Sequence, residues 1–323
     1  MDNKLPGTRN IKAAIKSMRL RTLPLSLAGV VLGCKLALAE WQVSGWVVAL
    51  VCLTTVCLQI LSNLSNEMGD VLRGTDTDDR QGPAYGLNSG EMTIAQMRRL
   101  IRAFVALCCG FGAAMIWVSY GTLFCLPAIC LLALGAAAIW AAMRYTLGRN
   151  PYGYRGLGDI FVFIFFGLVS VMGAYFVCAH TLDSWELVLP AAGIGFFSVG
   201  VLNINNIRDM KTDAANRVTV ALRLGLKRAR IYQTALICLG WAALIAYALL
   251  APCSGLAALA PCCAASASAS LAPSCAAALR WLFLLTLPLY IWHLRGVWTR
   301  TDAALDRYFP LLVLGTFALA LLY

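Results

Sequence analysis

Carboxylate and amide side chains gather in two short segments of this sequence. The first segment is NLSNEMGDVLRGTDTDDRQGP, residues 63–83, and the second is NINNIRDMKTDAANR, residues 203–217. Each begins where a long apolar run ends. Asn66 and Asp70 stand four residues apart, so their side chains lie on one face if the chain is helical there.

The second segment repeats this spacing. Asn205, Asp209 and Asp213 follow one another at intervals of four residues and are expected to share one helical face. Mg²⁺ prefers such oxygen ligands and usually takes one or two carboxylates together with water and substrate phosphates. Two facing clusters could hold metal ions that clamp a diphosphate. The candidate metal ligands are Asn66, Asp70, Asp76, Asp79, Asn206, Asp209 and Asp213.

Basic side chains are interleaved with these acids, which favours an anionic substrate such as a diphosphate. A solvated loop of mixed charge would explain either segment alone, but both share Asn-x-x-x-Asp at the end of an apolar run. We predict catalytic roles for Asp70, Asp209 and Asp213. Asp302 and Asp306 lack this context and are expected to lie away from the site. The predicted diphosphate contacts are Arg73, Arg80, Arg144, Tyr145 and Lys211.

The composition indicates an integral membrane protein. The 323 residues are 60% hydrophobic and 13% charged, with a mean hydropathy of +0.75, whereas soluble domains carry roughly 25% charged residues. The net charge of +11 would suggest a nucleic-acid partner only if the basic residues shared one face. They lie instead in short clusters between apolar runs, so we expect no nucleic acid to bind.

Nine apolar runs approach the roughly 20 residues that a helix needs to cross a bilayer. Alternate connections, starting with the N-terminus, hold 24 of the 26 Lys and Arg residues and leave only Lys35 and Arg280 for the other side. The positive-inside rule then places the N-terminus in the cytoplasm. We therefore predict an all-α integral membrane protein that forms a single transmembrane domain over residues 1–323. The runs lie near 23–39, 46–65, 103–119, 122–142, 160–180, 186–204, 233–251, 277–294 and 309–323.

The two clusters follow the second and the sixth apolar runs, a separation of four spans. This placement predicts two related four-helix units with a ninth helix appended, each unit giving one cluster to a shared site. Membrane proteins with internal repeats commonly bind substrate where the repeats meet. Residues 252–276, rich in Cys, Ser and Ala, are predicted to form a low-complexity extracytoplasmic loop.

Three sequence blocks resemble a known family. They are ILSNLSNEMGDVLRGTDTDDRQGP, NPYGYRGLGDIFVFIFFG and NNIRDMKTDAANRVTVALRLG, and LRTLPLSLAG near the start is similar as well. Together they resemble the UbiA-type intramembrane prenyltransferases, and within that superfamily the enzymes that act on 1,4-dihydroxy-2-naphthoate in menaquinone synthesis. One departure is Glu67, which stands where Asp is common in the first block.

The resemblance implies a Mg²⁺-dependent transfer of a polyprenyl group from polyprenyl diphosphate to 1,4-dihydroxy-2-naphthoate. The acceptor loses its carboxylate as CO₂, and demethylmenaquinone forms. The implied location is the inner membrane, in contact with lipid, with the active site toward the cytoplasm. Asp159, in the block GYRGLGDIF, is predicted as a fourth catalytic residue, which lines the acceptor pocket or orients the naphthoate hydroxyl. The alternative is that it caps the helix that begins there.

Two alternatives stay open on the sequence. Another aromatic acceptor, such as 4-hydroxybenzoate, would leave the same motifs in place. A secondary transporter would also carry intramembrane charge and internal repeats. Against transport, the acids lie at the ends of the apolar runs, and no run carries an acid at its centre.

Overall fold

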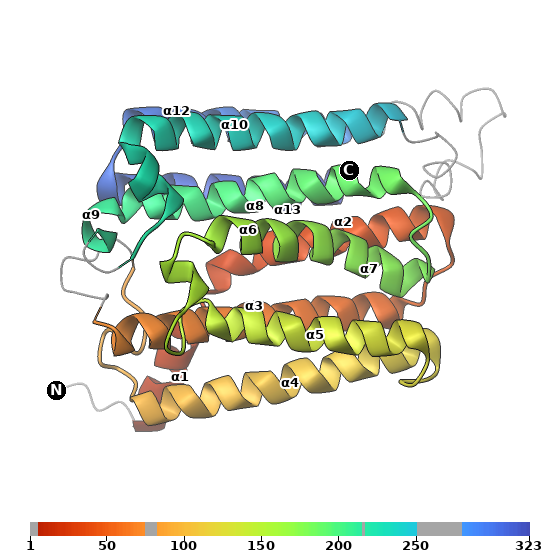
Figure 1. The fold of residues 1–323 in the computed structure, drawn as a ribbon, viewed down its shortest axis with the longest axis horizontal. Helices are drawn as coiled ribbons and strands as arrows, with labels where there is room; N and C mark the ends of the chain where they lie inside the picture. The colour runs from red at the N-terminus through yellow and green to blue at the C-terminus, as the bar shows by residue number, and fades with distance from the viewer. Residues whose placement is uncertain (1–5, 75–82, 215–216, 251–279) are drawn as a thin grey trace.

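The computed structural model describes residues 6–74, 83–214, 217–250 and 280–323. Long helices run side by side through this part of the chain and form one bundle (Figure 1). Every regular element within the described ranges is helical, which confirms the predicted all-α class. An isolated parallel bridge joins Arg155 to Val218.

The elements differ in length and in type. The α-helices are α1 (Pro6–Ser17), α2 (Leu23–Glu40), α3 (Gly45–Leu72), α4 (Ile94–Tyr120), α5 (Leu126–Arg144), α6 (Gly158–Val162), α7 (Ser170–Ala179), α8 (Val188–Arg208), α9 (Met210–Asp213), α10 (Val220–Leu250), α12 (Leu287–Thr299) and α13 (Phe309–Leu322). The 3₁₀ segments are η1 (Leu20–Thr22), η2 (Tyr152–Tyr154), η4 (Trp185–Leu187), η6 (Leu282–Thr286) and η7 (Asp302–Tyr308). A π-helical stretch, η3 (Phe163–Val169), joins α6 to α7 without a break.

Eight helices in the described part of the chain are long and apolar enough to span a membrane. Each corresponds to one of the predicted apolar runs, although the helices extend beyond the runs. The remaining predicted run, 277–294, coincides in its described part with η6 and α12, which lie outside these eight.

Four of the long helices continue into polar sequence, so hydropathy alone ends α3 and α8 too early and starts α4 and α10 too late. α3 and α8 extend to Leu72 and Arg208, so both carry motif residues on their last turns. α4 begins at Ile94, where Thr93 and Gln96 form a capping box that satisfies free backbone donors. α10 begins at Val220 and carries several basic side chains in its first turns.

The core is densest around α8, which packs against α10, η3 and α13. Close approach of α2 to α7 depends on Gly29 and Gly33, because a Cβ at either position would overlap Ser170 or the carbonyl of Val171. Small residues four apart commonly permit such approach between membrane helices.

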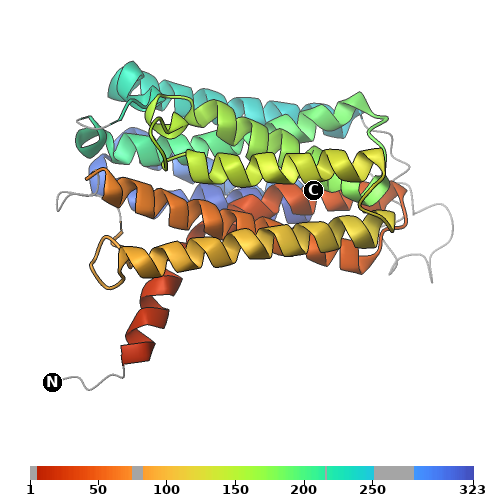
Figure 2. The same ribbon diagram turned by 60° about the horizontal axis from the view of Figure 1, so that its bottom comes forward.

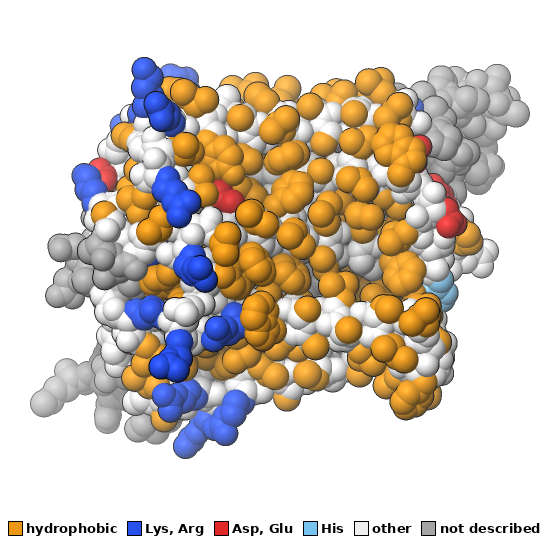
Figure 3. Space-filling model, in the orientation of Figure 1, with side chains coloured by type: hydrophobic (Ala, Val, Ile, Leu, Met, Phe, Trp, Pro, Cys, Tyr) orange, Lys and Arg blue, Asp and Glu red, His pale blue; other side chains and the backbone are white. Residues whose placement is uncertain are grey.

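Charge is distributed unevenly along the bundle. Figure 3 shows most Lys and Arg gathered at one end, a broad apolar belt across the middle, a His at the other end, and Asp and Glu toward both ends. Helix α1 lies at the basic end and leaves the bundle at a steep angle (Figure 2). The C-terminal ends of α3 and α8, which carry the two clusters, also lie at the basic end (Figure 1).

Candidate active site

A cavity of about 410 Å³ extends from the basic end into the bundle. Its charged lining comes from the segment before α2, the end of α3, the end of α8 and the segment around α9. Apolar side chains of α2, α3, α5, η3 and α7 line most of the rest. A charged rim over an apolar chamber suits a ligand with an anionic head and a hydrocarbon tail.

The first cluster lies on the last turns of α3. Asn66 and Asp70 both line the cavity, as their four-residue spacing predicts. Asp70 is 6% exposed, and the Tyr154 hydroxyl donates a hydrogen bond of 2.6 Å to its Oδ1. The helix thus presents its amide and carboxylate oxygens to the cavity.

The second cluster lies where α8 ends. Asn205, Asn206, Asp209 and Asp213 all line the cavity. Asp209 (φ −94°, ψ 9°) separates α8 from α9 and departs from regular helical angles. The spacing of four residues nevertheless continues across it, because the Asp209 N–H donates to the Asn205 carbonyl at 2.9 Å and the Asp213 N–H donates to the Asp209 carbonyl at 2.8 Å. All three residues thus lie at the same cavity.

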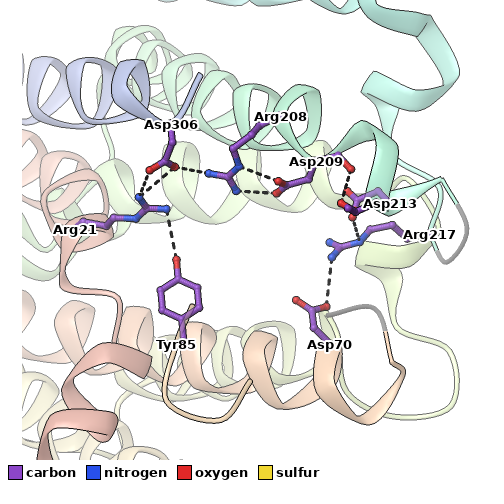
Figure 4. Close-up of polar contacts among 9 residues, drawn as sticks. Arg21, Asp70, Tyr85, Arg208, Asp209, Asp213, Arg217 and Asp306 are labelled. Carbon is purple, nitrogen blue, oxygen red and sulfur yellow. Dashed lines mark hydrogen bonds and ion pairs between the residues drawn. The ribbon is translucent and has the colours of Figure 1, made fainter. Parts of the chain in front are cut away.

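Arg217 lies between the two clusters (Figure 4). Its Nε is 2.9 Å from Asp213 Oδ1, and its Nη2 is 3.5 Å from Asp70 Oδ1. The neighbouring Val218 N–H donates to the Tyr154 carbonyl at 3.1 Å, which ties this segment to η2. One guanidinium thus connects carboxylates that are far apart in the sequence.

Burial and neighbouring charges shift the pKa values of Asp213 and Arg217. Burial raises the pKa of Asp213 to about 6, while Arg217 opposes the rise and Asp209 and Asp70 add to it. Burial disfavours the Arg217 cation, but Asp70 and Asp213 outweigh it and raise the arginine pKa. Burial also raises the pKa of the cavity-lining Tyr145 to about 12, so this phenol keeps its proton. Arg217 therefore keeps its positive charge between Asp70 and Asp213.

A second charge chain runs along the rim (Figure 4). Arg208 donates two hydrogen bonds to Asp209, at 2.8 and 2.7 Å, and a third to Asp306 at 2.5 Å. Asp306 also pairs with Arg21 at 2.9 Å, and Arg21 reaches the Tyr85 hydroxyl at 3.5 Å. These contacts join the segment before α2 to η7 and to the second cluster.

Two features of this chain differ from the sequence analysis. Asp306 was expected to lie away from the site, but it contacts Arg208 and Arg21, which both line the cavity. That expectation is therefore wrong, because η7 folds back against the end of α8. Arg19 and Arg21 were not predicted as site residues, although both line the cavity. Arg19 directly precedes the block LRTLPLSLAG, and Arg21 lies in it.

Several predicted diphosphate contacts lie outside the cavity lining. Lys211 points to Asp302, 3.0 Å away, on an exposed surface. Arg73 is exposed and donates to the Gly148 carbonyl at 2.5 Å. Arg144 does not line the cavity either, whereas Tyr145 does. Arg80, Asp76 and Asp79 lie outside the described residues.

Asp159 occupies the first turn of α6, and its Oδ2 accepts a hydrogen bond of 3.0 Å from the Tyr232 hydroxyl. It does not line the cavity, although Phe161 of the same helix does. A carboxylate in the first turn is favourable at a helix N-terminus. The N-cap is Leu157, however, and no side chain forms a capping hydrogen bond there, so the expectation that Asp159 caps this helix is wrong.

Glu67 faces away from the cavity. Its side chain is fully buried, and its Oε1 accepts hydrogen bonds from the backbone N–H groups of Leu87 and Asn88, at 2.6 and 3.2 Å. The longer side chain at this position holds the loop between α3 and α4 against the helix. The structure therefore places Glu67 away from any direct role in metal binding.

The apolar part of the cavity contains aromatic rings. Phe161, Phe165 and Phe166 line it. Phe163 packs instead on Phe196, with ring centroids 5.0 Å apart. The lining rings come from the segment in which α6 passes into the π-helical η3, and such π segments frequently occur at functional sites.

The donor set at the charged end fits Mg²⁺. Carboxylate and amide oxygens of the two clusters line it, and the buried Oδ1 of the cavity-lining Asn205 has no hydrogen-bond partner. Among the described residues, no three His, Cys, Asp or Glu side chains come close enough to enclose an ion. Mg²⁺ commonly completes its shell with water and substrate phosphates. The residues present thus suit a hard cation that binds together with a phosphate ligand.

Solved structures with the same fold are known. A UbiA homologue from Aeropyrum pernix K1 superimposes with a TM-score of 0.65 at 17% identity, covering 94% of this chain and 97% of that chain. A UbiA homologue from Archaeoglobus fulgidus, solved with GPP and Mg²⁺ bound, gives a TM-score of 0.59 at 13% identity, covering 95% and 99%. At these identities the likeness establishes the fold.

Curated relatives are more similar in sequence. The 1,4-dihydroxy-2-naphthoate octaprenyltransferase of Escherichia coli is 42% identical over 227 residues, covering 70% of this chain and 73% of the relative. The enzyme of the same name from Haemophilus influenzae is 39% identical over 253 residues, covering 77% and 80%. The UbiA prenyltransferase family model matches residues 26–285, a range that contains both clusters. These matches confirm the resemblance seen in the motif blocks, and the chain belongs to the UbiA prenyltransferase family.

Proposed function

We propose that this protein transfers a polyprenyl group from polyprenyl diphosphate to 1,4-dihydroxy-2-naphthoate. Diphosphate and CO₂ leave, and demethylmenaquinone forms in its reduced state. One observation carries the proposal: Asp70 and Asp213, from separate halves of the chain, meet around Arg217 at the charged end of a largely apolar cavity. The diphosphate head would bind at this end, and the hydrocarbon tail would occupy the apolar part.

The charged end of the cavity would provide oxygen ligands for a metal ion and basic side chains for the diphosphate. When bound, Mg²⁺ would neutralise the charge that gathers on the departing diphosphate. Arg208, Arg217 and Tyr145 line the same region and would bind diphosphate oxygens, and Arg80 of the first motif is proposed to join them. The residues that would hold Mg²⁺ are Asn66, Asp70, Asn206, Asp209 and Asp213, and we propose Asp76 and Asp79 as further ligands.

The apolar part protects the reacting carbon from water. As the allylic C–O bond breaks, its electron pair leaves with the diphosphate, and the electron-rich ring of the acceptor supplies the pair for the new C–C bond. Water would capture the allylic cation in an open site, so an enclosed cavity favours transfer to the acceptor. The faces of Phe161, Phe165 and Phe166 would stabilise positive charge there. Asp159 is proposed to position α6, which carries Phe161.

The choice of acceptor rests on the relatives. Enzymes 38–42% identical to this chain are named for 1,4-dihydroxy-2-naphthoate. The test is transfer by the purified protein in lipid nanodiscs, with Mg²⁺, a polyprenyl diphosphate and either 1,4-dihydroxy-2-naphthoate or 4-hydroxybenzoate. We expect kcat/KM to favour the naphthoate by about 10²-fold or more, a ratio that a few kcal/mol of transition-state binding supplies. Equal rates, or preference for the benzoate, would assign the cavity to a different aromatic acceptor.

We further infer the arrangement in the membrane. The single domain, residues 1–323, would cross the inner membrane nine times, with η6 and α12 completing the eighth crossing. Two four-helix units and a final helix would build the site, and the basic end seen in Figure 3 would face the cytoplasm. The diphosphate would then bind on the cytoplasmic side.

Thiol labelling of intact cells tests this orientation. Asp183 and Arg149 are exposed at opposite ends of the bundle, so each is replaced by Cys in a parent whose Cys253, Cys262, Cys263 and Cys275 are Ser. A membrane-impermeant maleimide added outside should label D183C at once and should label R149C only after the inner membrane is permeabilised. Labelling in the reverse order would invert the topology.

A further inference from the structure

Arg217 occupies the position between the clusters that the proposed function gives to a metal–diphosphate complex. The side chain of Arg217 is 19% exposed, and those of Asp70 and Asp213 are 8% and 7% exposed. The guanidinium also lies over the Tyr154 ring, 5.2 Å from its centroid. This cation is therefore enclosed by two carboxylates and an aromatic face.

Two buried carboxylates need a positive charge between them. Arg217 contacts both carboxylates, with Nε 2.9 Å from Asp213 Oδ1 and Nη2 3.5 Å from Asp70 Oδ1. This cation thus holds the two clusters together before any ligand arrives.

Two other arginines of the cavity lining pair with acids other than Asp70 and Asp213. Arg208 pairs with Asp209 and Asp306, and Arg21 pairs with Asp306. The contact of Arg217 Nη2 with Asp70, at 3.5 Å, is longer than the 2.7–2.9 Å typical of charge-assisted hydrogen bonds, whereas its Nε is 2.9 Å from Asp213. The contact of Arg217 with the first cluster is thus the easier of the two to exchange.

We propose that Arg217 is a resident cation, which holds Asp70 and Asp213 together in the metal-free site and moves onto the diphosphate when metal and diphosphate bind together. A divalent ion arriving alone must displace the guanidinium from its carboxylates and leaves it without an anionic partner. With diphosphate present, the guanidinium gains phosphate oxygens as bidentate acceptors. Arg217 therefore couples the two ligands, so that metal binds weakly alone and tightly with diphosphate.

This inference rests on the proposed function, and a binding measurement tests it without turnover. The protein in nanodiscs is dialysed against Mn²⁺, with and without inorganic diphosphate, and bound Mn²⁺ is the excess on the protein side measured by electron paramagnetic resonance. For the wild type, we expect diphosphate to raise Mn²⁺ affinity about tenfold or more, within the ordinary range of coupling between sites. An unchanged affinity would overturn the inference, whatever the variants show.

Variants of Arg217 then test whether this side chain competes with the metal ion and whether it couples metal binding to diphosphate binding. In Arg217→Gln, Mn²⁺ alone should bind about tenfold more tightly than to the wild type, and the enhancement by diphosphate should shrink by a similar factor. Arg217→Lys keeps the charge and should retain the weak metal-only binding. Arg223→Gln removes the same charge from an exposed position outside the cavity lining, and should match the wild type.

The outcomes distinguish the two proposals. If the wild type binds Mn²⁺ with diphosphate but Arg217→Gln shows no tighter metal-only binding, the resident-cation role falls and the metal site stands. If the wild type binds no Mn²⁺ under either condition, the metal site of the proposed function falls, and this inference falls with it. If Arg217→Gln does not insert, tight metal-only binding by the wild type or by Arg217→Lys contradicts the role.

Discussion

Replacing Asp70 or Asp213 by Asn is expected to lower kcat/KM for prenyl transfer by about 10²-fold or more. Each substitution keeps the size of the side chain and removes the negative charge that faces the cavity. Metal ions contribute several kcal/mol to charge stabilisation in the transition state, and each 1.36 kcal/mol is about tenfold in rate. Because both carboxylates serve one site, the double variant should be little worse than either single variant.

The matched control is Asp302→Asn. Asp302 lies in the last loop at the same end of the bundle and pairs with the exposed Lys211, outside the cavity lining. Its backbone has φ of +52°, which Asn tolerates better than Ala does. Activity should stay within about threefold of the parent, since exposed ion pairs contribute little. Equal losses for Asp302→Asn and Asp70→Asn, with both proteins inserted normally, would mean that the site is elsewhere.

Removal of divalent metal is expected to lower the rate of transfer by about 10³-fold, and added Mg²⁺ should restore it. The reason is the donor set, in which amide and carboxylate oxygens from two segments face one cavity that would hold a diphosphate. The measurement is single-turnover transfer after dialysis against EDTA, with residual metal determined by mass spectrometry. A control dialysed without chelator should keep full activity.

Undiminished transfer in protein shown to be free of metal would contradict the two-cluster arrangement. Positive charge for the leaving group would then have to come from basic side chains such as Arg208, Arg217, Arg21 and Arg19. All four line the cavity, so the distinction needs the metal content to be measured together with the rate.

Much of the fold could be predicted because helices that span a membrane need long runs of apolar residues, which are visible in the sequence. The long apolar runs predicted the eight helices that, in the described part of the chain, are long and apolar enough to span a membrane. The spacing of Asn66 and Asp70 predicted their shared face, since α3 continues regularly to Leu72. Periodicity is informative wherever one element continues through the motif.

The remaining features depend on contacts between distant segments. Spacing alone does not reveal the irregular backbone at Asp209, whose carboxylate accepts two hydrogen bonds from Arg208. The role of Asp306 depends on η7 folding back onto α8, a tertiary contact with no motif to mark it. Lys211 looked suitable by sequence position, but the turn after Asp209 directs its side chain toward Asp302.

The π-helical stretch η3 was also not predictable from composition. Its sequence, FIFFGLV, is uniformly apolar and fits any membrane helix. Gly167 in this stretch lies so close to Gly195 of α8 that a Cβ could not be accommodated without a shift. Packing against α8 accompanies the irregular turn, which in turn sets the positions of Phe165 and Phe166 at the cavity.

The most direct test of the central claim is the identity of the product and the fate of the acceptor carboxylate. Purified protein in nanodiscs is supplied with Mg²⁺, a polyprenyl diphosphate and 1,4-dihydroxy-2-naphthoate labelled with ¹³C at the carboxylate, and the lipid extract and headspace are analysed by mass spectrometry. We predict prenylated naphthoquinol without the label, and labelled CO₂ in equal amount. A prenylated product that keeps the label, or no prenylated naphthalene from folded and metal-loaded protein, would contradict it.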